Sequence, residues 1–464
     1  MLRIIKAALT SLFPSTRDGA DSTTAAAWRT RLVRGGFVTL TIYAISAFLI
    51  LFVNLLLARA LGVHNYGVYT FMVAAAGFTA VFGRSGLDAV VIRFIPEYRT
   101  GGRILAINGL LRAARVIVVG VTLVCALVMV AVIWQSPRWR AEAAAGSLIV
   151  AAVLVPFTAL MTLNQGILQG FGRSGKALLA DYLIRPAFIG IVVAIWWWIT
   201  RSMVAPDIAL ASTLAALTLG LGLQFWWIAQ ARSAVLGSER RAEYAVRNWL
   251  GVALPVLGIG ALSAVLTKGD VLLLGTLRGA TDVGYYNVAV RISGFVSFGV
   301  MALNGVVAPM VSELYASSKW DELRRLMNRT IQLSSVLGVA GTIGIIVLAP
   351  LVFRAFGPEF KAGWWPLLIL LGGRLVSVSV GPVGYFLLMT NSHRAAFWIL
   401  VQAALLEVGV GIVTILLFGA VGAAIATSLA MTSWNIAMVV YLRRKFGWWI
   451  VPFYGIPRNR EIVI

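Results

Sequence analysis

Long apolar runs alternate with short polar stretches along almost the whole chain. The runs are about twenty residues long, which is the length that an α-helix needs to cross a bilayer. Each is expected to be helical, because a backbone in lipid must satisfy its own hydrogen bonds. The pattern predicts twelve spans, at residues 37–60, 67–91, 113–134, 143–168, 177–200, 208–229, 249–277, 284–311, 331–353, 364–389, 396–418 and 421–442. The polar break at Gly419 and Ala420 is so short that it implies either a tight hairpin or a miscount.

Lys and Arg residues gather in every second predicted loop and in both terminal segments. Loops on the opposite side contain few of them. Because cytoplasmic loops of membrane proteins carry the excess of Lys and Arg, this pattern places both termini in the cytoplasm. Trp clusters at the ends of the predicted spans are typical of interfacial aromatic belts.

An internal repeat divides the chain. The stretch Leu55–Tyr69 (LLLARALGVHNYGVY) has a counterpart 217 residues later at Leu272–Tyr286 (LLLGTLRGATDVGYY). Further residues match at the same offset: Gly77 and Gly294, Phe78 and Phe295, Val90 and Val307, Tyr98 and Tyr315, Arg112 and Arg329. An offset near half the chain length indicates two halves of one ancestral unit.

Six spans per half give both halves the same orientation, which predicts a parallel repeat about an axis along the membrane normal. The expected fold is an all-α integral membrane protein with two six-helix lobes and a central cavity, where a substrate would bind near the bilayer midplane. The expected parts are a cytoplasmic N-terminal segment at 1–36, a first lobe at 37–229, a basic cytoplasmic linker at 230–248, a second lobe at 249–442 and a cytoplasmic tail at 443–464.

Composition agrees with a membrane protein, since 60% of the residues are hydrophobic and 12% are charged. The net charge of +22 belongs mostly to the loops, so topology explains it better than nucleic-acid binding does. Cys125 is the only cysteine, which excludes a Cys-based metal site within the chain. Gly170–Ala177 resembles a phosphate-binding loop but lacks the Ser or Thr that holds Mg²⁺. We expect no metal, no cofactor and no catalytic residues.

Charged residues inside the predicted spans are the candidate functional groups, because charges in lipid are costly and usually face a cavity or a partner. Some of them lie close enough in sequence to pair with each other: Arg84 with Asp88, Asp181 with Arg185, and Lys268 with Asp270. Structural pairing and a functional role both stay open for these groups.

Arg291 and Arg374 have no acidic residue one turn away, which favours a role in a cavity. Several cations in a central cavity suit an anion such as a pyrophosphate, because Arg donates its hydrogen bonds in pairs. We predict Arg84, Arg291 and Arg374 as substrate-binding residues. Asp88 and Glu407 are candidates for ion coupling, and Glu407 is alternatively a partner of the arginines across helices.

Several stretches resemble one transporter family. They are ARALGVHNYGVYTFMVAAAG with RFIPEY at Arg93–Tyr98, KGDVLLLGTLRGATDVGYYNVAVRI at Lys268–Ile292, FGPEFKAGWWPLLIL at Phe356–Leu370 and GAVGAAIATSLA at Gly419–Ala430. In order and spacing they resemble the polysaccharide transporters, the lipid-linked oligosaccharide flippases of the multidrug/oligosaccharidyl-lipid/polysaccharide exporter superfamily.

This resemblance implies a flippase of the bacterial inner membrane. It would move undecaprenyl-pyrophosphate-linked oligosaccharide units by alternating access, for O-antigen, capsule or exopolysaccharide synthesis. H⁺ or Na⁺ coupling, and a polymerase and export machinery as partners, are implied as well. The chain lacks the two additional helices of lipid II flippases, which disfavours that branch.

Other classes of function stay open. A multidrug cation antiporter of the same superfamily should prefer acidic residues over Arg in its cavity. A membrane-embedded polysaccharide polymerase or ligase should carry a large outer loop, whereas all the predicted outer loops are short. A scaffold without transport activity is a further alternative. We expect a transporter rather than an enzyme.

Overall fold

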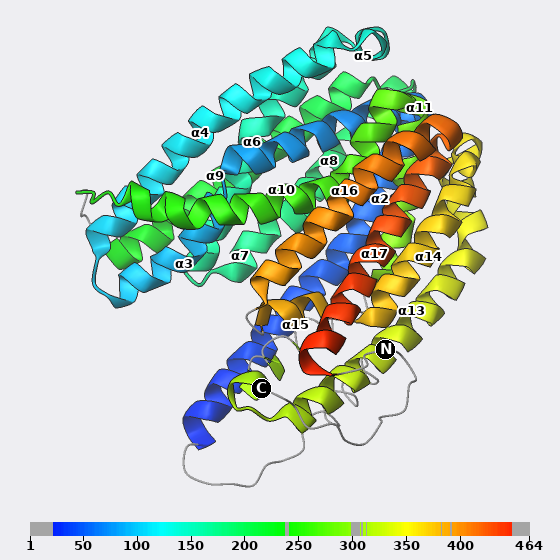
Figure 1. Ribbon diagram of the computed structural model, residues 1–464. Coiled ribbons are helices and arrows are strands. Elements are labelled where there is room, and N and C mark those ends of the chain that lie inside the picture. Colours follow the sequence, from blue (N-terminus) through cyan, green and yellow to red (C-terminus); the bar gives the residue numbers. More distant parts are fainter. Residues whose placement is uncertain are drawn as a thin grey trace.

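The computed structural model describes residues 22–236, 241–297, 307, 310–311, 313–381, 383–389 and 392–447. Every element described in these ranges is a helix. Long helices lie side by side in an elongated bundle (Figure 1). Among the described residues, ten helices are long and apolar enough to cross a membrane. The all-α integral membrane fold predicted from the sequence is confirmed.

The helices of the first half pack mainly on one another, through the pairs α6 with α9, α2 with α6 and α4 with α6. Their bounds are α2 Ser22–Arg84, α3 Leu87–Thr100, α4 Ile104–Gln135, α5 Pro137–Glu142, α6 Ala145–Gly170, α7 Ser174–Leu179, η1 Ala180–Ile184, α8 Arg185–Thr200 and α9 Pro206–Leu236.

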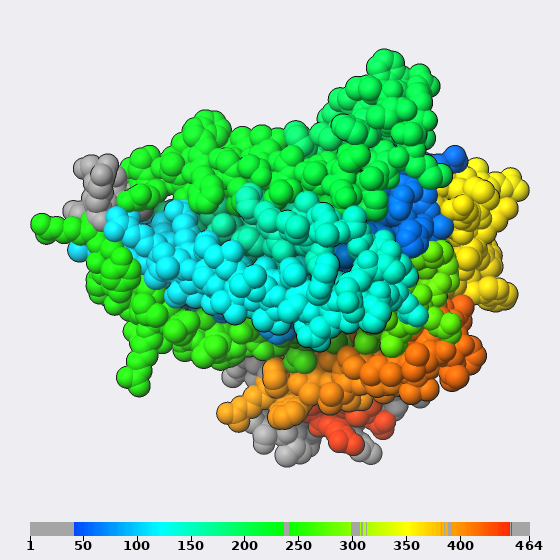
Figure 2. All heavy atoms as spheres, turned by 90° about the horizontal axis from the view of Figure 1, so that it is seen from above, coloured from blue at the N-terminus to red at the C-terminus, as the bar shows by residue number. Residues whose placement is uncertain are grey.

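The helices of the second half also pack mainly together, through the pairs α16 with α17, α14 with α17 and α13 with α14. Their bounds are α10 Val246–Leu277, α11 Ala280–Gly294, η2 Phe295–Ser297, α13 Trp320–Phe356, η3 Pro358–Gly363, α14 Trp364–Val380, α15 Val383–Met389, α16 His393–Phe418 and α17 Ala420–Phe446. Seen from above, the first half (cyan and teal) and the second half (yellow to red) lie on different sides of the molecule (Figure 2).

Glycines with positive φ make the corners between successive helices. Gly62 has φ 74° inside the segment assigned as α2, so the predicted spans 37–60 and 67–91 are two limbs that meet there. Gly279 lies 217 residues later, has φ 101° and separates α10 from α11. Gly419 has φ 58° between α16 and α17, so the tight hairpin is confirmed. An L-residue with a side chain rarely adopts such angles, which explains the glycines.

Two of the predicted spans are wrong in extent. Span 67–91 is broken because α2 ends at Arg84, and Ser85 (φ 53°) and Gly86 (φ 73°) turn the chain before α3 begins. Span 364–389 is broken because α14 ends before Gly381, which has φ 73°. Gly381 and Pro382 mark the second break in the sequence, whereas the first is hidden because the apolar pattern resumes directly after Ser85 and Gly86.

The predicted span 177–200 contains a π-helical turn, η1. Its cause is Pro186, which has no N–H to donate to the carbonyl of Tyr182. Instead the N–H of Arg185 bonds to the carbonyl of Ala180, five residues back. The predicted span 284–311 begins in α11, and its residues 298–306 lie outside the described residues.

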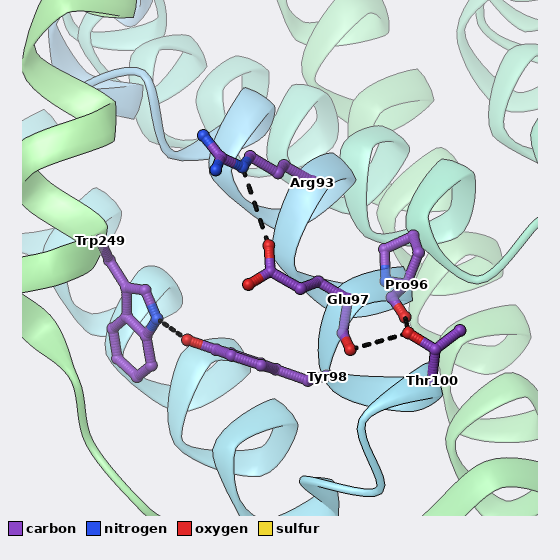
Figure 3. A network of polar contacts seen from close by, with 6 residues as sticks. All are labelled: Arg93, Pro96, Glu97, Tyr98, Thr100 and Trp249. Atoms are coloured by element: carbon purple, nitrogen blue, oxygen red, sulfur yellow. Dashed lines mark hydrogen bonds and ion pairs between the residues drawn. The ribbon is translucent and has the colours of Figure 1, made fainter.

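Helix α10 contacts both halves. Its first turns pack on α3, where Trp249 Nε1 donates a 2.9 Å hydrogen bond to the hydroxyl of Tyr98 (Figure 3). Close by, an added Cβ on Gly86 would lie 2.3 Å from the carbonyl oxygen of Ala253. Towards its other end α10 packs on α16 and α17. The first half therefore contacts α10 near both of its ends, since Gly275 also packs on Phe71, and the second half packs on α10 through α16 and α17.

The two repeated corners meet each other reciprocally. A Cβ added to Gly67 would lie 1.8 Å from the carbonyl oxygen of Ala280, and one added to Gly284 would lie 2.2 Å from that of Val63. Because Gly284 and Ala280 correspond to Gly67 and Val63 at the offset of 217, each corner makes the same contact with the other. Such reciprocity is what a two-fold axis between two copies produces. Only glycine fits at positions 67 and 284.

Candidate functional site

Three cations from both halves of the chain interact electrostatically through Lys268. Arg185 comes from α8 of the first half, Lys268 from α10 and Arg291 from α11. Both arginines act electrostatically on Lys268, as does the carboxylate of Asp270. Lys268 and Arg185 are half-buried and Arg291 is exposed. Like charges held together in a low-dielectric setting favour an anion between them.

A buried polar chain stands behind this group. Tyr66 is fully buried and donates a 2.8 Å hydrogen bond to Asn54, and it accepts a 3.2 Å hydrogen bond from Asn287 on α11. Arg291 acts electrostatically on both Tyr66 and Tyr69. The chain joins the first half to the second and fixes the helix faces that present the cations.

A second buried polar cluster lies within the second half, where α10, α11, α14, α16 and α17 converge. Asp270 accepts hydrogen bonds from Tyr286 (2.8 Å) and from the N–H of Val271 (2.7 Å). Arg374 on α14 is an electrostatic neighbour of Asp270 and Tyr286. The cluster thus contains a buried acid with a cation beside it.

Glu407 completes this cluster. It is 1% exposed, and its polar neighbours are Thr427 and Asp270. Its Oε1, like the Nε of Arg374, has no hydrogen-bond partner in the part of the chain that the structure describes. A buried carboxyl without an ion-pair partner needs a proton or a metal cation to offset its charge. The described residues show no direct ion pair between Glu407 and an arginine.

Arg84 and Asp88 form an ion pair at 3.1 Å, although a turn and not one continuous helix separates them. Asp181 and Arg185 also pair, at 2.6 Å. Lys268 and Asp270 are electrostatic neighbours, but Tyr286 is the side chain that bonds to Asp270. Local pairing therefore accounts for two of these pairs of charges.

The structure separates the three arginines that the sequence singled out. Arg291 belongs to the group of three cations, Arg374 to the cluster of the second half, and Arg84 to a pair in the first half. Arg185 and Lys268 join Arg291, although the sequence favoured local partners for both. The spacing of these residues in the sequence does not determine which face each of the three helices presents to the others.

Sequence reasoning also missed contacts at the opposite ends of the helices. Arg59 on α2 donates to the carbonyls of Ala355 (2.5 Å) and Arg354 (3.0 Å) at the end of α13. In the short helix α5, Arg138 donates to the carbonyl of Leu277, and Glu142 accepts from the N–H of Ala280 at 2.8 Å. These side chains of the first half bind helix ends that belong to α10, α11 and α13.

An all-helical fold with ten helices long and apolar enough to cross a membrane among the described residues defines a multi-pass membrane protein. The model of the family described as polysaccharide biosynthesis protein matches residues 32–315. The match covers more than half of the chain, and the chain belongs to this family.

Curated relatives of this chain are also named as flippases or transporters. Agl15 of Haloferax volcanii is named as a probable low-salt glycan biosynthesis flippase. It is 21% identical to this chain over 386 residues, which are 83% of this chain and 78% of Agl15. A protein of Salmonella typhimurium named as an O-antigen transporter is 26% identical over 141 residues, 30% of this chain and 33% of that protein.

Solved structures share the fold. The lipid II flippase MurJ in an inward closed conformation matches with a TM-score of 0.65 and 16% identity, over 88% of this chain and 87% of that chain. An inward-facing multidrug resistance transporter of the MATE family matches with a TM-score of 0.62 and 15% identity, over 87% of this chain and 94% of that chain. The family and its relatives make this chain a membrane flippase or transporter of polysaccharide biosynthesis.

Proposed function

We propose that the protein flips undecaprenyl-pyrophosphate-linked oligosaccharide units across the bacterial inner membrane, for synthesis of an O-antigen, a capsule or an exopolysaccharide. Both termini lie in the cytoplasm in this proposal. The observation that carries it is the group of Arg185, Lys268 and Arg291, which comes from both halves. A pyrophosphate bound there accepts charge-assisted hydrogen bonds from cations of both halves, of which Arg185 also pairs with Asp181.

Transport proceeds by alternating access of a first lobe at 37–229 and a second lobe at 249–442. The contacts of Arg59, Arg138 and Glu142 with helix ends support a conformation that is closed on the outer side. The cations then face the cytoplasmic side, where the substrate is made.

The remaining candidate residues keep roles in this proposal. Arg84 and Arg374 are substrate contacts whose carboxylate neighbours a phosphate must displace or compete with. Glu407 is the preferred coupling residue for H⁺ or Na⁺, because it is buried and its Oε1 has no hydrogen-bond partner among the described residues. Asp88 is the second candidate, since its Oδ1 has none there either.

The test measures binding of farnesyl pyrophosphate to the purified protein in nanodiscs. Replacement of Arg291 or Lys268 by Gln removes charge-assisted hydrogen bonds, so affinity should fall by about tenfold or more. Arg201→Gln is the matched control, because Arg201 lies over the ring of Trp198 at the far end of α8. In producing cells, Arg291→Gln should lower polymer export at unchanged protein level.

Wild-type protein that does not bind the pyrophosphate would overturn the proposal. So would an Arg291→Gln strain that exports normal amounts of polymer.

A further inference from the structure

A pair of tyrosines lies next to the cations of the first half. Tyr43 on α2 and Tyr182 in η1 meet edge to face, with ring centroids 4.9 Å apart and planes at 88°. Both side chains are half-buried. Asp181 precedes Tyr182, and its Oδ1 accepts the 2.6 Å bond from Arg185. Asp181, Tyr182 and Arg185 therefore lie within about one turn of the chain, and Tyr43 of α2 packs against that turn.

The π-helical turn is what brings these groups together. Insertion of one extra residue into the turn, forced by Pro186, shifts the register of Asp181 and Tyr182 against that of α8. Beyond the turn, α8 packs tightly on α2, where a Cβ on Gly190 would lie 2.9 Å from Val53. Because α8 packs tightly on α2 beyond the turn, whereas the π-helical turn itself is wider, the two tyrosines stay half-buried.

The depth of the pair fits an extended ligand. Tyr43 lies six residues into the apolar run that begins at Phe37, about 9 Å along the helix, and Tyr182 lies about 12 Å along the segment that begins at Ser174. Lys268 lies further from the cytoplasmic side, about 14 Å from the opposite end of α10. When the phosphates of a lipid-linked ligand bind the cations, the group attached to those phosphates lies beside the tyrosines, on the cytoplasmic side of the cations.

We infer that Tyr43, Tyr182 and Asp181 form a subsite for the first sugar of the lipid-linked glycan, an inference that rests on the proposed function. Aromatic rings offer apolar faces that match the C–H faces of a pyranose. A carboxylate accepts hydrogen bonds from sugar hydroxyls, and Asp181 has a second oxygen for this purpose beside the one bonded to Arg185. The subsite selects a glycosylated carrier over the bare carrier.

The test compares two probes on the purified protein in nanodiscs: farnesyl pyrophosphate and farnesyl-pyrophosphoryl N-acetylglucosamine. Wild-type protein should bind the sugar-bearing probe more tightly. Tyr182→Leu should weaken binding of that probe by about tenfold, the scale of one aromatic contact, and leave the bare probe unchanged. Tyr182→Phe keeps the ring and should keep most of the difference.

Phe188→Leu on the same helix is the matched control, because Phe188 is a half-buried aromatic packed on the apolar core. It should change neither affinity. Thermal unfolding of each variant identifies any that fail to fold, and Tyr43→Leu then serves as the second variant.

The outcomes separate the two proposals. If wild-type protein binds both probes equally, or if Tyr182→Leu weakens both equally, the sugar subsite is wrong and the pyrophosphate site stands. If neither probe binds, the proposed function fails and the subsite fails with it.

Discussion

The contact of α5 with the second corner predicts how the outer side stays closed. Glu142 accepts the N–H of Ala280 at the start of α11, and Arg138 donates to the carbonyl of Leu277 at the end of α10. The acidic Glu142 therefore lies at the positive, N-terminal end of α11, and the basic Arg138 lies at the negative, C-terminal end of α10. A Cβ on Gly279 would lie 2.6 Å from Glu142 Oε1, which shows how closely the side chain approaches the corner.

Glu142→Gln keeps an acceptor but removes the charge. The lost charge–dipole interaction and the weaker hydrogen bond amount to about 1 kcal/mol. At 1.36 kcal/mol per factor of ten, the ratio of outward-open to outward-closed protein should rise about fivefold. Glu142→Ala removes the acceptor as well and should raise the ratio further.

Pulsed electron–electron double resonance between two spin labels measures this ratio. With Cys125→Ser as background, spin labels at Arg140 and Ala362, both exposed, report the separation of the lobes. The fraction of long distances should grow in Glu142→Gln and stay unchanged in Glu359→Gln, which alters an exposed acid on η3. Identical distance distributions for wild type and both Glu142 variants, with all proteins folded, would refute this role for α5.

Three further predictions concern packing and charge. Gly67→Ala forces a methyl group against backbone and should lower the free energy of unfolding by about 1–3 kcal/mol, whereas Gly77→Ala, with nothing within 4 Å, should not lower it; denaturation in detergent compares the two. Arg374→Gln should lower polymer export at normal protein level because it removes one of the two cations beside the Asp270 carboxylate, the other being Lys268; thermal unfolding of Arg374→Gln with and without Asp270→Asn shows whether the uncompensated carboxylate also lowers stability. Trp249→Phe loses one buried hydrogen bond and should lower the unfolding temperature by an amount equivalent to about 1 kcal/mol; an unchanged temperature would contradict that contact.

Much of the fold is readable from the sequence because hydrophobic length and glycine corners are local signals. The corner at Gly62, its counterpart at Gly279 and the hairpin at Gly419 all have positive φ in the structure. The break after Arg84 escaped because Ser85 and Gly86 interrupt an apolar pattern that resumes at once. A hydropathy average over a whole span cannot register a turn of two residues.

The candidate site was only partly readable. Sequence reasoning named Arg185, Lys268 and Arg291 as charges within spans, but their grouping depends on how three helices rotate about their axes. It also named Glu407 and Arg374 as candidates, but it did not place the buried Asp270 beside both. Side-chain convergence across helices is a property of packing, and a single sequence does not encode it in any local spacing.

The reciprocal contact at the two corners limits how the halves of this chain can diverge in evolution. A larger residue at position 67 meets Ala280 of the other half, and one at position 284 meets Val63. Both clashes are with backbone carbonyl oxygens, which no substitution in the opposite repeat removes, so both positions are expected to stay glycine. Lipid-facing positions carry no such constraint and are free to drift apart. This difference accounts for the glycines that Leu55–Tyr69 and Leu272–Tyr286 share at positions 67 and 284.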